Sequence, residues 1–204
     1  DKGSVDEAIY GGRHGYDILE RFLNNCSRHL NDNGIILIVF SSRTNKQRVD
    51  GIIEANCLEF EELQQKHIFF ETLYAYLIRK SQLLLQLQQR GIKNVNLFEK
   101  GNRGLIYGGS YKGKTVAVKT KRKESAAVAT IENEINWLKK LNREGIGPKL
   151  LFSEKEWFSY EFVDGMFITE FIGSCSEKEK LFDVIKQLLQ QCRKLDVLKV
   201  NKEE

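Results

Sequence analysis

The sequence has little of the residues that mark several protein classes. It contains one proline, four cysteines without a CxxC pair, and no apolar run near the roughly 18 residues that a membrane span needs. The scattered cysteines argue against a disulfide framework or a metal site, and they favour reduced thiols in a cytoplasmic protein. These are Cys26, Cys57, Cys175 and Cys192. The first residues, DKGSVDEAIYGG, are acidic and show no signal-peptide pattern.

The sequence also lacks a large excess of positive over negative charge. The net charge of +4 over 204 residues is smaller than that of most free nucleic-acid binders. Apolar residues make up 41% of the chain, which is enough for packed cores in one domain or in two modest ones. The chain starts without Met and ends directly after a helical pattern, so we expect it to be part of a longer protein.

The first eighty residues predict an α/β arrangement. Apolar residues at helical spacing in GYDILERFLNNCSRHLN predict a helix, which the turn at residues 31–34 ends. The continuous run GIILIVFSS, residues 34–42, is typical of a strand buried on both faces in a parallel sheet. A helix is expected over 45–56, and the alternation in 57–81 predicts two antiparallel strands joined by a loop.

The rest of the chain predicts short strands and long helices. Residues 82–94 read as a helix and junction closed by Gly91, followed by strands at NVNLFEKG, GLIYGGSYKG and KTVAVKTKR. A long helix is expected over 124–145, just before Pro148. The segments WFSYEFV and MFITEF predict two more strands, and residues 176–198 predict a last amphipathic helix.

The glycine-rich stretch GNRGLIYGGSYKGKTVAVK, residues 101–119, admits three interpretations. From Gly108 it contains GGSYKGKT, which satisfies the G-x4-G-K-T spacing of a Walker A loop. A Walker A loop opens a helix, however, whereas Lys114 and Thr115 enter a segment that reads as a strand. The stretch therefore predicts either an ordinary β-hairpin with no binding role or the glycine-rich lid and lysine-bearing strand of a protein kinase.

The kinase interpretation assigns a role to each residue of the stretch. Gly101 and Gly104 fill two of the three glycine positions, with Glu99 in place of the first, and Asn102 lies between them. Ile106 would pack on adenine, and the small Ala117 would leave space for the purine. Lys119, which ends Val-Ala-Val-Lys, would bind phosphate and needs a carboxylate to hold it.

The following helix supplies a candidate carboxylate. Glu134 lies beside the apolar stripe of ENEINWLKKLN, where it could reach Lys119. Alternatively, Glu132 and Glu134 form a solvated face that pairs with Lys139 or Lys140. After two further strands, Glu161 to Val163 would form a hinge that offers a backbone amide and carbonyl to adenine.

With these residues in view, the chain from about residue 85 to 204 resembles a family of small archaeal predicted serine/threonine kinases. These are relatives of the RIO kinases and of the kinase in the KEOPS tRNA-modification complex. The matching segments are KGNRGLIY, KTVAVKTKR, ENEINWLKKLN, GIGPKLLF and YEFVDG. The resemblance implies a five-stranded antiparallel kinase N-lobe with one long helix, followed by the first helix of the C-lobe, over residues 95–204. It also implies ATP and Mg²⁺ as cofactors.

The catalytic half of a kinase is missing from the sequence. All three histidines precede the glycine loop, so no HRD motif can follow it, and Asp164-Gly165 comes too early for a DFG motif. Asp196 and Asn201 have the D-x4-N spacing of a catalytic loop, but Asp196 reads as a helix end. We therefore expect the metal ligands to lie outside this sequence, and the sequence alone to be inactive.

Residues 1–81 resemble the C-terminal part of a class I S-adenosylmethionine-dependent methyltransferase of the HemK type, which modifies release-factor glutamine. The resemblance rests on DEAIYGGRHGYDILERFLNNCSRHLNDNGIILIVFSS and on KHIFFETLYAYLIRKS, with Gly11-Gly12 and Gly15 matching a GGxxG. The family's Asn-Pro-Pro-Tyr and its glycine-rich motif are absent, so S-adenosylmethionine is expected only if an upstream half exists. His14 reads as a loop residue.

Together these features predict a transferase: an atypical kinase N-lobe fused to a methyltransferase C-terminus. A non-catalytic nucleotide-binding module is one alternative. An RNA-binding factor of translation or tRNA modification is another, through the basic residues Lys112, Lys114, Lys119, Lys121, Arg122 and Lys123. The expected partners are ATP and a protein substrate linked to translation, with little or no nucleic acid and no membrane.

Overall fold

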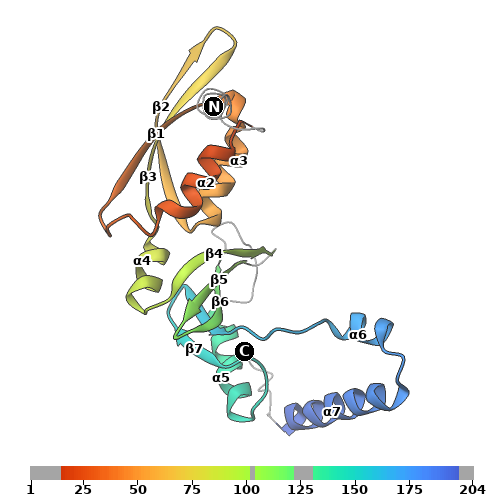
Figure 1. Ribbon diagram of the computed structural model, residues 1–204. Coiled ribbons are helices and arrows are strands. Elements are labelled where there is room, and N and C mark those ends of the chain that lie inside the picture. The colour runs from red at the N-terminus through yellow and green to blue at the C-terminus, as the bar shows by residue number, and fades with distance from the viewer. Residues whose placement is uncertain (1–14, 102–103, 122–130, 198–204) are drawn as a thin grey trace. The chain divides into compact units, whose positions relative to one another are not determined.

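The computed structural model describes residues 15–101, 104–121 and 131–197 of the chain (Figure 1). They form a mixed α/β protein with two antiparallel sheets, one of three strands and one of five. By their contacts the chain divides into two compact units. The first unit runs to Gly101 and includes Leu105–Thr115, and the second holds Gly104 and the chain from Val116. The predicted domain boundary at residues 82–94 stays a prediction.

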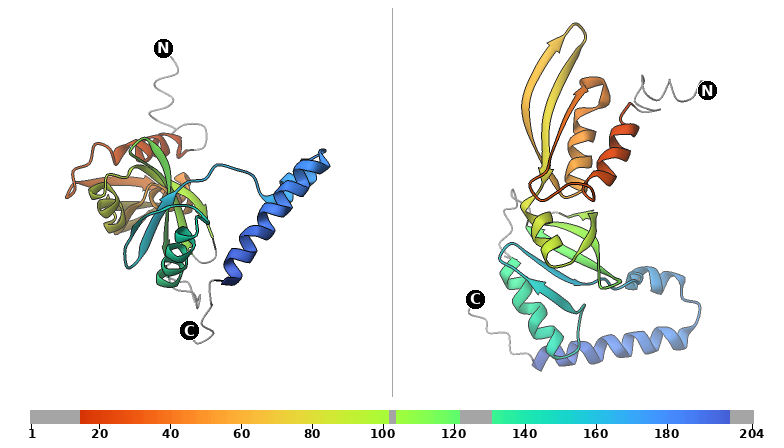
Figure 2. Two further views of the ribbon diagram at one scale, coloured as in Figure 1. Left: turned by 90° about the horizontal axis from the view of Figure 1, so that it is seen from below. Right: turned by 60° about the vertical axis from the view of Figure 1, so that its left-hand side comes forward.

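The three-stranded sheet has the order β1-β3-β2, with β3 antiparallel to both neighbours. Its strands are β1 (Ile35–Ser41), β2 (Leu58–Ile68) and β3 (Glu71–Lys80). Helices α2 (Asp17–Cys26) and α3 (Lys46–Ala55) lie side by side on one face of this sheet, as Figure 1 and the right-hand view of Figure 2 show. The 3-10 turn η1 (Ser42–Thr44) joins β1 to α3.

For residues 34–42, the predicted environment, a strand buried on both faces in a parallel sheet, was wrong. The segment is a strand, but among the described residues it lies at the edge of an antiparallel sheet, and only its helix-facing side is covered there. Ile35, Leu37 and Val39 are exposed, whereas Phe40 is buried against the helices. A run of apolar residues predicts a strand well, but it does not reveal which neighbours will cover the strand, because those lie far away in the sequence.

The predicted helices and hairpin of this region are confirmed, and local capping explains their limits. The Asn45 side chain accepts a hydrogen bond from the backbone N–H of Arg48 at the start of α3. Ser81 does the same for Leu84 at the start of α4 (Gln82–Gln89). Gly91, with φ of +82°, follows the end of α4, where a left-handed residue commonly closes a helix.

The five-stranded sheet has the order β4-β5-β6-β8-β7. Its strands are β4 (Lys93–Lys100), β5 (Gly104–Tyr111), β6 (Lys114–Lys121), β7 (Leu150–Ser153) and β8 (Trp157–Glu161). Helix α5 (Ile131–Arg143) packs on β8 through Ile131, Ile135, Leu138 and Phe158. The predicted long helix is therefore confirmed over α5, and its expected start at 124–130 lies outside the described residues.

The C-terminal segment contains one wrong prediction. MFITEF, predicted as a strand, begins helix α6 (Ile168–Ser174). The Glu170 carboxylate accepts a hydrogen bond from the backbone N–H of Phe167, which satisfies a donor at the helix start and favours a helical turn over a strand. Helix α7 (Lys178–Val197) confirms the last predicted helix, and no described residue of α6 or α7 is buried.

Candidate functional site

The predicted lysine and glutamate lie in contact in the second unit. Lys119 Nζ donates to Glu134 Oε2 at 2.5 Å, between strand β6 and helix α5. Both side chains are about a quarter exposed, so the ion pair lies at the surface of the core. Glu134 therefore pairs with Lys119, where the alternative interpretation expected Lys139 or Lys140.

Strand register explains why Lys119 faces the helix. Lys119 lies directly opposite Phe158 in the antiparallel pairing of β6 with β8. Side chains of directly opposite residues project from the same face of a sheet. Because Phe158 packs against Ile135 of α5, Lys119 points towards the same helix, and Glu134 is the neighbour of Ile135 in the sequence.

Ala117 shares this face of β6, two residues before Lys119. It lies opposite Tyr160 and is 3% exposed, and Val116 and Val118 on either side are fully buried. A larger side chain at position 117 would therefore enter the space next to the lysine. The small residue that the sequence analysis singled out does lie on the lysine's face of the sheet.

Gly104, the first residue of β5, lies against the strand that carries Lys119. A Cβ atom at position 104 would stand 2.3 Å from the carbonyl oxygen of Thr120 and 3.9 Å from Cε of Lys119. The first distance is far shorter than any contact that a side chain can make, so the backbones approach here as only glycine permits. This gives the glycine a definite steric role beside the ion pair.

The predicted hinge begins at the end of β8. The backbone N–H of Glu161 donates to the carbonyl oxygen of Lys149 at 2.9 Å. The amide of Glu161 is therefore used within the sheet, and an adenine would have to take its amide donor from a later residue. Val163 lies two residues beyond the end of the strand and is 69% exposed, so the predicted hinge leaves the sheet between these residues.

The remaining residues of the predicted lid fall in several places. Gly101 follows β4, and Ile106 lies in β5 and is half-buried; both belong to the first unit. Glu99, at the missing-glycine position, pairs with Ile106. Asn102 lies outside the described residues, as do Arg122, Lys123, Asn201, Gly11, Gly12 and His14.

The Walker A interpretation does not fit the local structure. Lys112 and Gly113 have positive φ angles of 49° and 79°, as in the tight two-residue turn of a β-hairpin. Lys114 and Thr115 then open strand β6, as the sequence analysis expected. The phosphate-holding helix N-terminus of a Walker A loop is therefore replaced by a strand.

Asn142 is a positioning residue that the sequence analysis missed. Its amide donates to the carbonyl oxygens of Ile146 (3.2 Å) and Pro148 (2.9 Å), and its carbonyl accepts from the backbone N–H of Leu150 at 2.8 Å. It thus ties the end of α5, and with it Glu134, to strand β7. The available signal in the sequence was the turn from Gly145 to Pro148 directly after the helix, which contains two glycines and the proline.

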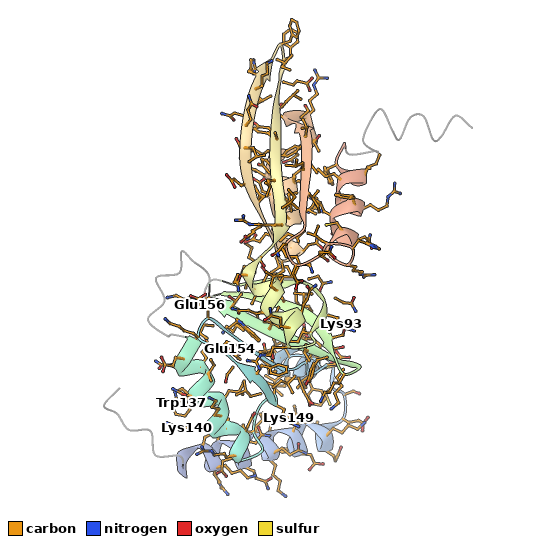
Figure 3. All side chains as sticks on the ribbon, turned by 90° about the vertical axis from the view of Figure 1, so that its left-hand side faces the viewer. Lys93, Trp137, Lys140, Lys149, Glu154 and Glu156 are labelled. Carbon is orange, nitrogen blue, oxygen red and sulfur yellow. The ribbon has the colours of Figure 1, made fainter. Side chains whose placement is uncertain are left out.

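The exposed side of α5 shows a different arrangement. Trp137 and Lys140, both labelled in Figure 3, project from this helix, and Lys140 Nζ lies 5.1 Å from the centre of the Trp137 ring. Trp137 is exposed on the helix surface. This cation–π pair stands apart from the buried residues of α5, and Lys140 therefore provides a matched control for Lys119.

Comparison of the chain with protein-family models and with curated proteins gave no match. Among the described residues, no three His, Cys, Asp or Glu side chains gather as a metal site would require. Within the same residues, no helix combines the length and the apolar character needed to cross a membrane. The function must therefore be argued from the geometry of the site itself.

Proposed function

We propose that this chain carries the ATP-binding part of an atypical, RIO-like serine/threonine kinase. The observation that supports the proposal best is the ion pair between Lys119 and Glu134, with its 2.5 Å contact. A partly exposed ion pair contributes only about 0–1 kcal/mol to stability, so its value to the protein lies elsewhere. A carboxylate that fixes an ammonium in place prepares it to bind an anion such as a phosphate.

The surroundings support a nucleotide in particular. Gly104 keeps the backbone close to Lys119, and Ala117 keeps the neighbouring position on the same face small. The carbonyl of Glu161 and the backbone of Val163 would bind the adenine edge. The assignment of Gly101 and Ile106 to the lid rests on the glycine pattern of the sequence alone. Lys119 and Glu134 would orient the phosphates. The ligands of Mg²⁺ and the catalytic aspartate would be residues that are not in this sequence.

A nucleotide-binding module without phosphoryl transfer is the alternative, since the same ion pair serves binding alone. Phosphate transfer measured on the full-length gene product separates the two functions. ATP binding without transfer would support the module and contradict the kinase.

We also propose that the first unit contains the C-terminal part of a methyltransferase-like sheet. The support is the succession of β1, α3 and the antiparallel pair β2 and β3, in which β3 lies between the other two strands. No step of methyl transfer can be assigned to the residues present.

Thermal unfolding with and without ATP and Mg²⁺ tests the nucleotide site. At a ligand concentration 100 times its dissociation constant, binding should add about 2.7 kcal/mol to the stability of the folded chain. Lys119→Ala should abolish this shift, and Glu134→Gln should reduce it, because the lysine then lacks its carboxylate. Lys140→Ala, on the exposed side of the same helix, should leave the shift unchanged.

Failure of saturating ATP and Mg²⁺ to raise the unfolding temperature would contradict the proposed site. An equal shift in the wild type and in Lys119→Ala would mean that nucleotide binds elsewhere. Circular dichroism of each variant confirms that it is folded before the comparison is made.

A further inference from the structure

The first unit contains a cavity of about 690 Å³ that the proposed functions leave unused. Its walls come from the ends of helices α2 and α3, from α4 and from strand β4. Cavities of roughly 300–1,000 Å³ are the size that holds small-molecule ligands. All of its lining residues belong to this unit, whereas Lys119 and Glu134 belong to the other, so the cavity is distinct from the proposed nucleotide site.

Two cations line this cavity without an acidic partner in the described structure. Arg28 follows the end of α2, and Lys93, labelled in Figure 3, begins strand β4; neither side chain has a hydrogen bond or ion pair with a described residue. The described lining contains no Asp or Glu, and the nearby carboxylate of Glu54 is held by Lys100. The negative end of the α2 dipole favours a cation such as Arg28. That reason does not apply to Lys93, so the pair indicates a site for an anion.

The amide of Asn56 is held in one orientation in the cavity wall. Its Nδ2 donates to Asn24 Oδ1 and to the carbonyl oxygen of Ile52, both at 2.8 Å. Both N–H groups are thereby used, and no described residue donates to the remaining Oδ1. Asn56 is only 8% exposed, and the polar atoms of such buried side chains usually have partners. A hydroxyl or N–H group of a ligand in the cavity would supply one.

Strand β4 is irregular where it lines the cavity. All residues from 93 to 97 line it, although a regular strand points successive side chains to opposite faces. A register shift between Lys93 and Asn96 interrupts this alternation, and Asn94 has a positive φ of 54°. The Asn94 amide donates to Ser110 Oγ at 3.2 Å, which ties this segment to β5. Bulges of this kind are frequent next to functional sites, where they change the direction of side chains.

Hydrogen bonds between elements fix the other walls. The Tyr107 hydroxyl donates to the carbonyl oxygen of Glu54 at 3.3 Å, which holds the end of α3 against β5. Ser81 Oγ donates to the carbonyl oxygen of Cys57 at 2.6 Å and joins the same end of α3 to the start of α4. Because the protein itself makes these bonds, the cavity is formed before a ligand enters, as small-molecule sites usually are.

We propose that this cavity binds a small phosphate monoester with hydroxyl groups, of the class of sugar phosphates and nucleotides. Arg28 and Lys93 contact the phosphate, and Asn56 Oδ1 accepts a hydrogen bond from a hydroxyl group. A phosphate monoester carries a charge of about −1.5 to −2 at pH 7, which matches two cations, whereas a carboxylate carries one charge. The buried side chains of Leu84 and Val95 supply apolar surface for the rest of the ligand.

Titration with ribose 5-phosphate, followed by calorimetry and by the amide signals in NMR spectra, tests the proposal. AMP is the nucleotide probe, and ribose is the probe without a phosphate. The phosphate-bearing probe that binds should shift the signals of residues 93–97 and of Asn56. Ribose should bind at least about tenfold more weakly, because it lacks the charge-assisted hydrogen bonds. The tighter of the two phosphate probes identifies the ligand as a sugar phosphate or a nucleotide.

Two variants test the cations. Arg28 and Lys93 are exposed, so Arg28→Ala and Lys93→Ala should keep the fold, which circular dichroism checks. Each should weaken binding of ribose 5-phosphate or AMP by about tenfold. Lys66→Ala, at an exposed lysine of strand β2 in the same unit, is the matched control and should bind as the wild type does.

Three outcomes would overturn the proposal. The wild type fails to bind either phosphate probe at millimolar concentration, or it binds ribose as tightly as ribose 5-phosphate. The third is binding that is equal in the wild type, Arg28→Ala and Lys93→Ala. AMP binding that is lost in Lys119→Ala and kept in Arg28→Ala would belong to the proposed nucleotide site and would contradict a second site for AMP.

Discussion

The two compact units each hold a partly exposed lysine, and the two lysines have different surroundings. In the first unit, Lys46 Nζ contacts Asp50 at 3.2 Å and Glu62 at 3.4 Å, and it lies 5.3 Å from the ring centre of Tyr76. Two further rings, Phe60 and Tyr74, lie within 6.0 Å. In the second unit, Lys119 contacts one carboxylate among the described residues, that of Glu134.

The difference indicates how each lysine is used. Two carboxylates and three aromatic faces satisfy the ammonium of Lys46 within the protein, and hydrogen bonding with Tyr76 is the main cause that raises its pKa above the ordinary value. Among the described residues Lys119 has one carboxylate partner, Glu134, and this arrangement is compatible with the proposed binding of a phosphate by its ammonium. We therefore expect the contacts of Lys46 to stabilise the fold, whereas those of Lys119 fit the proposed phosphate site.

The largest effect is expected from Gly104→Ala, which acts on the backbone of strand β6 next to Lys119. The new Cβ would meet the Thr120 carbonyl oxygen at 2.3 Å, so the strands must move apart. We expect a loss of about 2–3 kcal/mol in the free energy of unfolding and a smaller ATP-dependent shift. Gly108→Ala in the same strand is the control, because its nearest contact, Asn96 Oδ1, is at 3.4 Å.

Urea unfolding of both variants checks this prediction. If Gly104→Ala and Gly108→Ala lowered the free energy of unfolding equally, the predicted clash with the Thr120 carbonyl would be contradicted.

The two lysines can be exchanged for methionine to test the comparison directly. Lys46→Met should cost about 1–2 kcal/mol, because Asp50 and Glu62 then face each other without a cation, and it should leave the ATP shift intact. Lys119→Met should cost less than about 1 kcal/mol and abolish the ATP shift. Chemical unfolding and thermal shift on the same samples measure both quantities. A reversal of the two patterns would contradict the assigned roles.

Alkaline pH should affect the first unit through Tyr76. Burial raises the pKa of Tyr76 to about 12, from an ordinary value near 10. The folded state therefore favours the neutral phenol, so this contribution to stability is complete below about pH 10 and is lost as pH rises towards 12. Burial also raises the pKa of Cys57 to about 11, which adds to the same decline.

Urea midpoints at pH 8 and pH 11 measure this loss. Tyr76→Phe should show a smaller decline between the two pH values than the wild type, although it also loses the hydrogen bond from Tyr76 to Asp50. An identical decline in both proteins would mean that Tyr76 does not titrate in this window.

The secondary structure was largely predictable because its causes are local. Asn45 and Ser81 cap the starts of α3 and α4, Gly91 closes the end of α4, and Gly113 lies in the turn of a hairpin. The spacing of apolar residues in α2, α5 and α7 likewise predicts that each forms a helix with one apolar side. The strand predicted for MFITEF was wrong because the alternation of apolar and polar residues there is short. The carboxylate of Glu170, three residues after Phe167, stabilises a helical turn instead. Periodicity over six residues cannot separate these two outcomes.

The candidate site was predictable in its residues but not in its geometry. Lys119 and Glu134 could be selected because Val-Ala-Val-Lys ends a strand and Glu134 borders an apolar helical stripe. Their contact depends on α5 packing against Phe158 and on Asn142 holding the loop to β7. Neither depends on residues near Lys119 in the sequence, so neither could be predicted from the pattern around it.

The sequence by itself determined the strands, the turns and the chemical character of each face, because these follow from neighbouring residues and from backbone sterics. Only the tertiary structure decided which faces are covered. Among the described residues it left β1 at an edge where the sequence indicated a buried strand, and it brought Lys119 to Glu134 across a strand and a helix. Coverage and contact arise from packing between segments far apart in the chain, and local periodicity contains no information about them.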